Sequence, residues 1–237
     1  MALPLIQNTS SNSLKSLAED GHVKGSPKDK TDKQLELPIN FGEVVKGVYR
    51  SSFPHPRNFP ALKKLRLKTI MYIFLQSVTR TQLTEQDSTL VDEPYTYAHE
   101  EFIRENNITH HRILVQAHKD PKTRNPDTVF NSILQIILNP ANHPILVHCN
   151  KGKHRTGCTV ACFRKTQKWP MSDIIAEYRK YSFPKSRDLD ERFIFEFDIS
   201  NIARLAEEVN ASAWGLSDLA KSQLRAPSSV FDAAGMF

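Results

Sequence analysis

Cysteine is scarce in this chain: only three occur among 237 residues, Cys149, Cys158 and Cys162. An odd number within so short a stretch does not form the paired framework of a small secreted protein, which indicates a reducing compartment. No apolar run approaches the roughly 20 residues that a membrane-spanning helix needs. The apolar residues 1–7 follow no basic segment, so we expect no signal peptide. These absences predict a cytoplasmic location, with the nucleus as the other compartment that fits.

Acidic residues are nearly absent from residues 121–170, where eight Lys or Arg accompany one Asp, a local net charge of +7. The whole chain carries +6, so the other 187 residues together carry −1. A basic chain whose charge is spread evenly would suggest a nucleic-acid binder. Charge gathered in one segment instead predicts a site for an anionic substrate and no nucleic-acid partner. The eight cations are Lys122, Arg124, Lys151, Lys153, Arg155, Arg164, Lys165 and Lys168.

Composition divides the chain into three parts. Residues 1–36 are rich in Ser, Asn, Lys and Asp and lack periodicity, which predicts a disordered tail. We predict that residues 37–200 form one domain with a polar insertion at about 77–93. Residues 201–237 are predicted to be a C-terminal extension. Strands that alternate with helices indicate an α/β fold with a central, mostly parallel sheet flanked by helices. Apolar patterns predict strands at 44–50, 69–75, 112–116 and 145–148 and helices at 61–67, 97–106, 158–168 and 188–197, with two further helices capped by Asp127 and Ser172.

The segment that carries chemistry is residues 148–157, His-Cys-Asn-Lys-Gly-Lys-His-Arg-Thr-Gly, between an apolar strand and a helix. A loop in this position directs backbone N–H groups at one bound anion. Cys149 places a sulfur at the base of this cradle, and Arg155 a guanidinium over one side. Transfer of a phosphoryl group to sulfur needs a thiolate, which a helix N-terminus and nearby cations favour. Arg155 offers a planar fork for two phosphoryl oxygens. We therefore predict Cys149 and Arg155 as catalytic residues.

The remaining loop residues are predicted to bind substrate. Thr156 is placed to donate its hydroxyl group to the Cys149 sulfur, and His148 to orient the loop rather than to act as a base. The charges of the loop beyond Arg155 exceed what a monophosphate requires, which favours a substrate with many phosphates. The predicted substrate-binding set is Asn150, Lys151, Gly152, Lys153, His154, Thr156 and Gly157.

The spacing His-Cys, five residues, Arg-Thr is the signature of the cysteine-dependent protein tyrosine and dual-specificity phosphatases. The chain resembles the plant-and-fungi atypical dual-specificity group of that superfamily over about residues 38–198, with further matching stretches at 49–54, 58–59, 144–147, 177–178 and 183–185. This resemblance implies the three-layer tyrosine-phosphatase fold and no metal or cofactor. It also implies removal of the β-phosphate of inositol pyrophosphates, and activity on phosphotyrosine or small aryl phosphates in vitro.

A general acid is expected to protonate the leaving oxygen, and Asp120 is the first candidate because it lies in a polar loop after a strand. The similar proteins usually have an Asn-Lys-Glu-Pro run there, whereas this chain has His-Lys-Asp-Pro at 118–121. Asp127 is the second candidate, although it is more simply a helix cap. A departing phosphate is already a good leaving group. We therefore expect the acid to accelerate the reaction by less than the roughly 10²–10⁴-fold that is usual for general acid catalysis.

Several alternatives are set against this interpretation. A protein tyrosine phosphatase is one, and a phosphate-binding scaffold without turnover is another. A zinc site built on His148, Cys149, His154 and Cys158 lacks the second ligand pair of structural sites, and a Walker loop lacks its lysine. Cys158 and Cys162 are predicted as small core residues. Arg164, Lys165 and Lys168 are predicted as a solvated helix face, with substrate contact as the alternative.

Overall fold

The strand predicted at 69–75 forms an interior strand of the sheet as β3, Thr69–Phe74, with five of its six residues buried. The computed structural model describes residues 35–75 and 93–215. The predictions for the insertion at 77–93, for most of the tail and for the end of the extension therefore lie outside the described residues. In the described part β3 pairs in parallel with β5, Ile145–His148, and with β4, Thr109–Leu114.

The remaining edge of the sheet is a hairpin rather than the single strand predicted at 44–50. Strand β1, Gly42–Val45, pairs antiparallel with β2, Val48–Ser51, and β2 pairs in parallel with β5. The turn between them contains Gly47 at φ +82°, a conformation that a residue with a Cβ rarely adopts. The strand order is β1-β2-β5-β3-β4, so the prediction of a mostly parallel sheet is confirmed.

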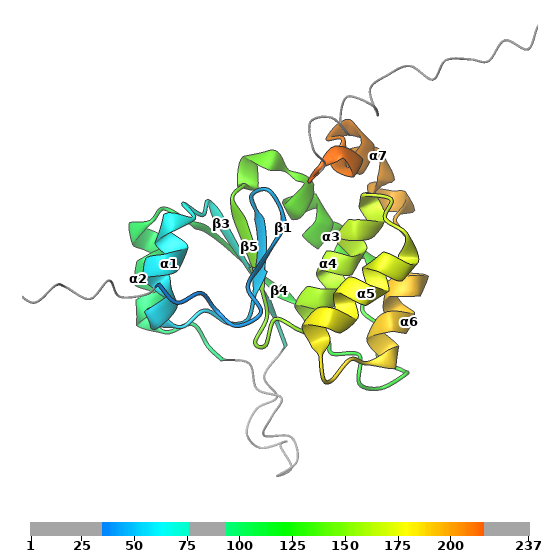
Figure 1. Cartoon of the computed structure of the whole chain (residues 1–237), viewed down its shortest axis with the longest axis horizontal. Coiled ribbons are helices and arrows are strands. Elements are labelled where there is room, and N and C mark those ends of the chain that lie inside the picture. The colour runs from blue at the N-terminus through cyan, green and yellow to red at the C-terminus, as the bar shows by residue number, and fades with distance from the viewer. Residues whose placement is uncertain (1–34, 76–92, 216–237) are drawn as a thin grey trace, which may run out of the picture. The chain divides into compact units, whose positions relative to one another are not determined.

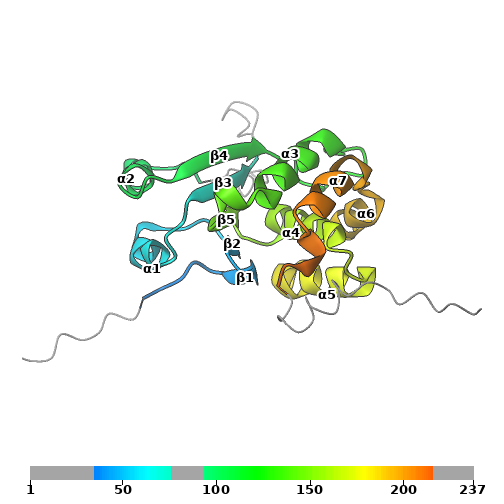
Figure 2. The same cartoon turned by 90° about the horizontal axis from the view of Figure 1, so that it is seen from above.

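Helices cover both faces of the sheet, as Figures 1 and 2 show. On one face lie α1, Phe59–Lys64, and α2, Tyr97–Glu105. On the other face lie α3, Asp127–Leu138; α4, His154–Thr166; α5, Met171–Ser182; α6, Asp188–Glu196; and α7, Ser200–Glu208. Short 3-10 turns occur at Pro56–Asn58, Pro140–Asn142 and Ala211–Ala213. None of the helices described is long and apolar enough to cross a bilayer.

Burial on both faces explains why the central strands are continuously apolar. Met71 and Val147 point into the large core that α3 to α7 cover, whereas Ile70 and Leu146 point into the smaller core under α1 and α2. Ile202 and other residues of 200–213 also belong to the large core. This part of the predicted extension therefore packs as part of the same fold.

Two predicted helix caps are wrong. Helix α3 begins at Asp127 itself, and its N-cap is Pro126. Helix α5 begins at Met171, before Ser172, and its N-cap is Pro170. In both cases a proline in extended conformation precedes the helix and fixes the direction in which the chain enters it. Helix α4 begins at His154, four residues earlier than predicted, so the end of the 148–157 motif is its first turn.

The predicted solvated face of α4 is wrong for Arg164, which is 5% exposed. Its guanidinium donates to both carboxylate oxygens of Glu177, at 2.8 and 3.1 Å, and to the carbonyl oxygen of Val44 at 2.9 Å. Lys165 donates to backbone carbonyls at the end of α6. Lys168 alone stays exposed, near Glu207. The reason is that α4 is packed between other helices. Its polar side chains therefore bind side chains and terminal carbonyl groups of those helices instead of water.

Candidate active site

The loop between β5 and α4 lies at the carboxyl edge of the parallel strands, where ligands of open α/β sheets bind. Three consecutive carbonyl groups of this loop are tied to groups outside it. The carbonyl oxygen of Asn150 accepts from the N–H of Phe53 at 3.0 Å, that of Lys151 from Asn40 Nδ2 at 2.8 Å, and that of Gly152 from Arg50 Nη2 at 2.9 Å. Because C=O and N–H point oppositely across a trans peptide, the amides that follow face the inside of the loop.

Gly152 is required where it stands. Its φ is +65°, and an added Cβ would lie 2.6 Å from backbone atoms of Ser51 and Ser52. The loop therefore rests directly on the end of β2, and only a residue without a side chain allows that approach. This contact explains one role of the 49–54 stretch, which the sequence marked without a function.

Arg50 is a site residue that the sequence reasoning missed. Its side chain is 1% exposed beneath the loop, and the guanidinium carbon lies 3.7 Å from the ring centroid of Tyr181. Burial lowers the pKa of Arg50, and the nearby Tyr181, Glu177 and Cys149 oppose that change. A buried cation thus holds the loop from below. The available signal was an arginine within an otherwise apolar strand pattern.

Cys149 and Arg155 line the same pocket, as the motif predicts. Cys149 is 3% exposed, and Arg155 Nη1 donates to the carbonyl oxygen of Ile73 at the end of β3, at 3.1 Å. Thr156 is fully buried, and its hydroxyl group has no hydrogen-bond partner among the described residues, so the predicted bond to the Cys149 sulfur is not formed. Its role as a donor to sulfur stays a prediction.

His148 lies in an aromatic stack behind the cysteine. Its Nε2 is 2.6 Å from the hydroxyl group of Tyr95, and its ring is stacked on Tyr72 at 4.8 Å between centroids. Burial lowers the pKa of His148 to about 3. The ring is therefore neutral at physiological pH and fixed by its neighbours, which supports a role in orienting the loop.

The pocket above the loop has a volume of about 400 Å³, and half of its twelve lining residues are Lys or Arg. None of them is Asp or Glu, and none is Phe, Tyr or Trp. The three cations that the sequence predicts are joined by Lys119, Lys185 and Arg187, which it did not assign. These come from two loops far from the motif in sequence, although both loops lie in stretches that the sequence had marked. The full lining is Leu75, Ala117, Lys119, Cys149, Asn150, Lys151, Lys153, His154, Arg155, Pro184, Lys185 and Arg187.

Lys153 and His154 also hold the loop at 183–187 against the motif. Lys153 Nζ donates to the carbonyl oxygen of Phe183 at 2.7 Å, and His154 Nε2 lies 2.6 Å from that of Lys185. Burial lowers the pKa of His154, although the hydrogen bond to Lys185 partly opposes this. His154 therefore adds less positive charge than the sequence suggested, and Lys185 brings an ammonium group that the sequence did not count.

The predicted general acid lies beside this pocket but does not line it. Asp120 is exposed, and its Oδ1 accepts from the N–H of Lys122 at 2.8 Å, within its own turn. Its neighbour Lys119 lines the pocket, as Ala117 does, whereas Asp120 lines an adjacent depression with His118 and Arg124. Asp127, the second candidate, lies 3.4 Å from Arg124 at the start of α3. The role of Asp120 as acid stays a prediction.

Cys158 and Cys162 are fully buried, as predicted for core residues. Burial raises the pKa of both thiols, which keeps them protonated. Within the described ranges, the cluster whose atoms could hold a metal ion is His118, Cys158 and Asp190, not the residues of the zinc alternative. The ring of His118 and the carboxylate of Asp190 already bind one another and other polar groups.

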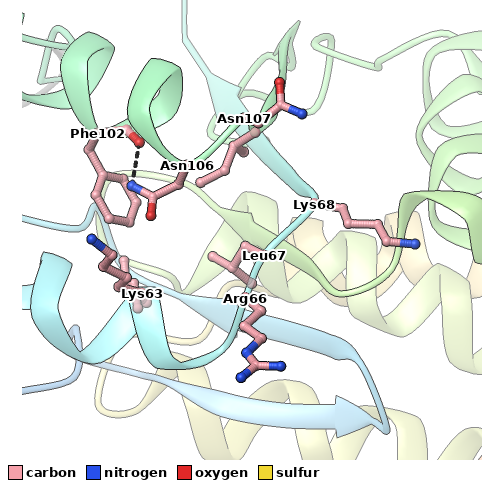
Figure 3. Close-up of a pocket in the computed structure, with 9 residues that line it drawn as sticks. Lys63, Arg66, Leu67, Lys68, Phe102, Asn106 and Asn107 are labelled. Atoms are coloured by element: carbon pink, nitrogen blue, oxygen red, sulfur yellow. Dashed lines mark hydrogen bonds between the residues drawn. The ribbon is translucent and has the colours of Figure 1, made fainter.

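A separate depression of about 450 Å³ lies between α1, α2 and the start of β3. Three cations border it, but Figure 3 shows that their side chains point in different directions, Lys63 toward Phe102 and Arg66 and Lys68 away from it. Its floor is apolar and includes Phe102. Diverging cations do not surround a single anion, so this depression is not a second cradle like the one at Cys149.

A cysteine at the base of an anion-binding loop, with an arginine six residues later at the carboxyl edge of a parallel sheet, defines the class of cysteine-based phosphatases. The chain belongs to the tyrosine phosphatase family, whose model matches residues 36–92 and 85–216. The predicted family is thereby confirmed.

The similarity to individual relatives is more specific than the match to the family model. The chain is 38% identical to the inositol diphosphatase SIW14 of Saccharomyces cerevisiae over 180 residues, which is 76% of this chain and 58% of the yeast protein. It is 40% identical to the inositol diphosphatase DSP3 of Arabidopsis thaliana over 71% of this chain and 74% of the relative. The solved Siw14 catalytic core matches with a TM-score of 0.66 and 36% identity over 78% of this chain and all of that one. The predicted three-layer α/β fold is confirmed by this match.

Proposed function

We propose that the chain is a cysteine-dependent phosphatase that hydrolyses the β-phosphate of inositol pyrophosphates. The observation that carries the proposal is the pocket around Cys149, in which six of twelve lining residues are cations and none is acidic. One arginine and the loop amides suffice for a single phosphoryl group. Five further cations suit a substrate whose other phosphates stay in place during the reaction. The names of the relatives, inositol diphosphatases, support the same substrate class.

The reaction proceeds in two steps in this proposal. The Cys149 thiolate attacks the β-phosphorus, an S–P bond forms, and the bond from phosphorus to the bridging oxygen breaks with release of the inositol phosphate. Arg155 and the loop amides bind the equatorial oxygens as charge develops on them. Water then attacks phosphocysteine, which releases inorganic phosphate and restores the thiolate. Asp120 is the proposed proton donor in the first step and acceptor in the second.

A protein tyrosine phosphatase is the alternative within the same class. The chain is 34% identical over 177 residues to a protein of Dictyostelium discoideum that is named a probable tyrosine-protein phosphatase. A phosphotyrosine pocket is expected to clamp the substrate ring between aromatic side chains, and no described residue that lines this pocket is Phe, Tyr or Trp. The pocket composition therefore favours the polyanion.

The test compares initial rates on a purified inositol pyrophosphate and on a phosphotyrosyl peptide, at equal and low substrate concentration. We expect faster hydrolysis of the pyrophosphate, and no turnover with Cys149→Ser, which retains binding. The double variant Lys151→Ala/Lys185→Ala should weaken hydrolysis of the pyrophosphate more than that of the peptide. Phosphate release by Cys149→Ser would disprove the mechanism, and faster hydrolysis of the peptide the substrate class. Absence of vanadate-sensitive hydrolysis would indicate the phosphate-binding scaffold.

A further inference from the structure

A buried carboxylate joins two walls of the Cys149 pocket. Asp190, on α6, is 1% exposed and accepts two hydrogen bonds: one from His118 at 2.9 Å and one from the Tyr178 hydroxyl group at 2.7 Å. Burial raises the pKa of Asp190, but these hydrogen bonds outweigh it and the net pKa is lowered. The carboxylate is therefore charged and fixed between a loop and a helix that are 60 residues apart in sequence.

The protonation of His118 follows from its partners. Asn125 Oδ1 accepts from the N–H of Gln116 at 2.7 Å, and Asn125 Nδ2 donates to the carbonyl oxygen of Gln116 at 2.9 Å. This pair of bonds fixes which end of the amide carries hydrogens. The same Nδ2 lies 2.9 Å from His118 Nε2, which must then accept. Neutral His118 consequently carries its hydrogen on Nδ1 and donates it to Asp190. Each group in this chain of bonds has a complementary partner.

The two ends of this network lie next to pocket cations that the motif does not supply. His118 precedes Lys119, and the Tyr178 hydroxyl group accepts from the backbone N–H of Arg187 at 3.2 Å. Both Lys119 and Arg187 line the pocket. The ring of Tyr178 also packs on the first turn of α4, where a Cβ on Gly157 would lie 2.9 Å from it. One carboxylate thus connects the loop of Lys119, the loop of Arg187 and the helix that carries Arg155.

We infer that His118 and Asp190 are positioning residues for substrate selection, which hold Lys119 and Arg187 where they bind phosphate groups other than the one transferred. The inference rests on the proposed function for the identity of the substrate, but its physical content is recognition of a polyanion. A buried polar network is costly to form, and apolar residues of the same volume often stabilise a core equally well. Its benefit here is a fixed placement of two charges.

The experiment measures inhibition of aryl phosphate hydrolysis by two anions, inositol hexakisphosphate and inorganic phosphate. Inorganic phosphate needs only the Cys149 loop, whereas the hexakisphosphate also needs the outer cations. His118→Phe removes both hydrogen bonds and keeps the ring contact with Phe193, now 4.5 Å between centroids. We expect its inhibition constant for the hexakisphosphate to rise about tenfold, equivalent to roughly 1.4 kcal/mol, with that for inorganic phosphate nearly unchanged.

Two variants serve as controls. His118→Asn places an amide N–H where the ring Nδ1–H lies and should restore the ratio of the two inhibition constants. Arg179→Gln removes the ion pair between Arg179 Nη2 and Glu191 Oε2, which are 2.7 Å apart. This pair links α5 and α6, the helices of Tyr178 and Asp190, but it is not part of the network. This variant should leave the ratio unchanged, as a merely structural link would.

The outcomes separate this inference from the proposed function. Equal weakening of both anions by His118→Phe, or no weakening of either in a folded variant, would overturn the inference. If the wild-type protein does not cleave the inositol pyrophosphate but the ratio still collapses in His118→Phe, the proposed function fails and the positioning role stands. If the wild-type protein does cleave the pyrophosphate and the ratio is insensitive to His118→Phe, the proposed function stands and the positioning role fails.

Discussion

Replacement of Gly152 by alanine should separate loop geometry from loop chemistry. The new Cβ would lie 2.6 Å from backbone atoms of Ser51 and Ser52, whereas ordinary contact begins at 3.4 Å, so the loop must move by about 0.8 Å. The φ of +65° adds a cost of about 1–2 kcal/mol for a residue with a side chain. A shift of this size misplaces the amides around the phosphoryl group, and displacements near 1 Å reduce rates by about 10²-fold.

The assay is kcat/KM on a small aryl phosphate, together with the thermal midpoint of unfolding. Gly47→Ala is the matched control, because its φ is +82° but its Cβ would meet the nearest atom, the Cβ of His143, at an ordinary 3.6 Å. Both variants should lose stability, but only Gly152→Ala should lose activity. The expected loss of kcat/KM is about 10²-fold. If folded Gly152→Ala instead retains more than about a third of the wild-type kcat/KM, the contact with β2 does not shape the cradle.

Three further predictions concern charge and burial. Arg164→Met leaves the partly buried carboxylate of Glu177, whose side chain is 19% exposed, without its arginine, and the unfolding free energy in urea should fall by about 2–3 kcal/mol; a loss below about 1 kcal/mol, typical of exposed pairs, would contradict the buried position of Arg164. Because the pKa of His148 falls from 6.5 to about 3 on folding, only the unfolded chain binds its proton in that range. Stability should therefore drop by up to about 1.4 kcal/mol per pH unit as the pH falls from about 6.5 to about 3, and His148→Gln should remove that share of the slope. Iodoacetamide should label native protein once, at Cys149, because Cys158 and Cys162 are fully buried; mass spectrometry would reveal labelling at either of them, which would refute this.

The sequence predicted those features whose cause is local. The strand at 69–74 was predictable because all of its residues except Thr69 are aliphatic or aromatic, and the motif at 148–157 because its nucleophile, amides and arginine come from ten consecutive residues. The hairpin was missed because Lys46 and Gly47 interrupt an apolar pattern that otherwise reads as one strand. The helix caps were not predictable from residue type alone, because Asp127 and Ser172 are good capping residues but lie inside the first turn, after the prolines that precede each helix.

The rest of the site depends on tertiary structure. Lys119 and Arg187 come from two loops that are distant in sequence and that the network around Asp190 connects. Arg164 and Lys168 look alike in sequence, yet Arg164 lies within α4 and is buried against Glu177 of α5, whereas Lys168 follows the end of α4 and is exposed. No periodicity distinguishes a cation that faces a neighbouring helix from one that faces water.

The cations around Cys149 have a consequence for turnover. In the proposed reaction the inositol phosphate that leaves keeps every phosphate except the one transferred. Cations that bind the spectator phosphates of the substrate therefore bind those of the product about as well, and such binding does not by itself accelerate the chemical step. We therefore expect release of the product to be the slow step, as it is in many enzymes. Moderate salt, which screens exposed charges, should accordingly raise kcat while it raises KM.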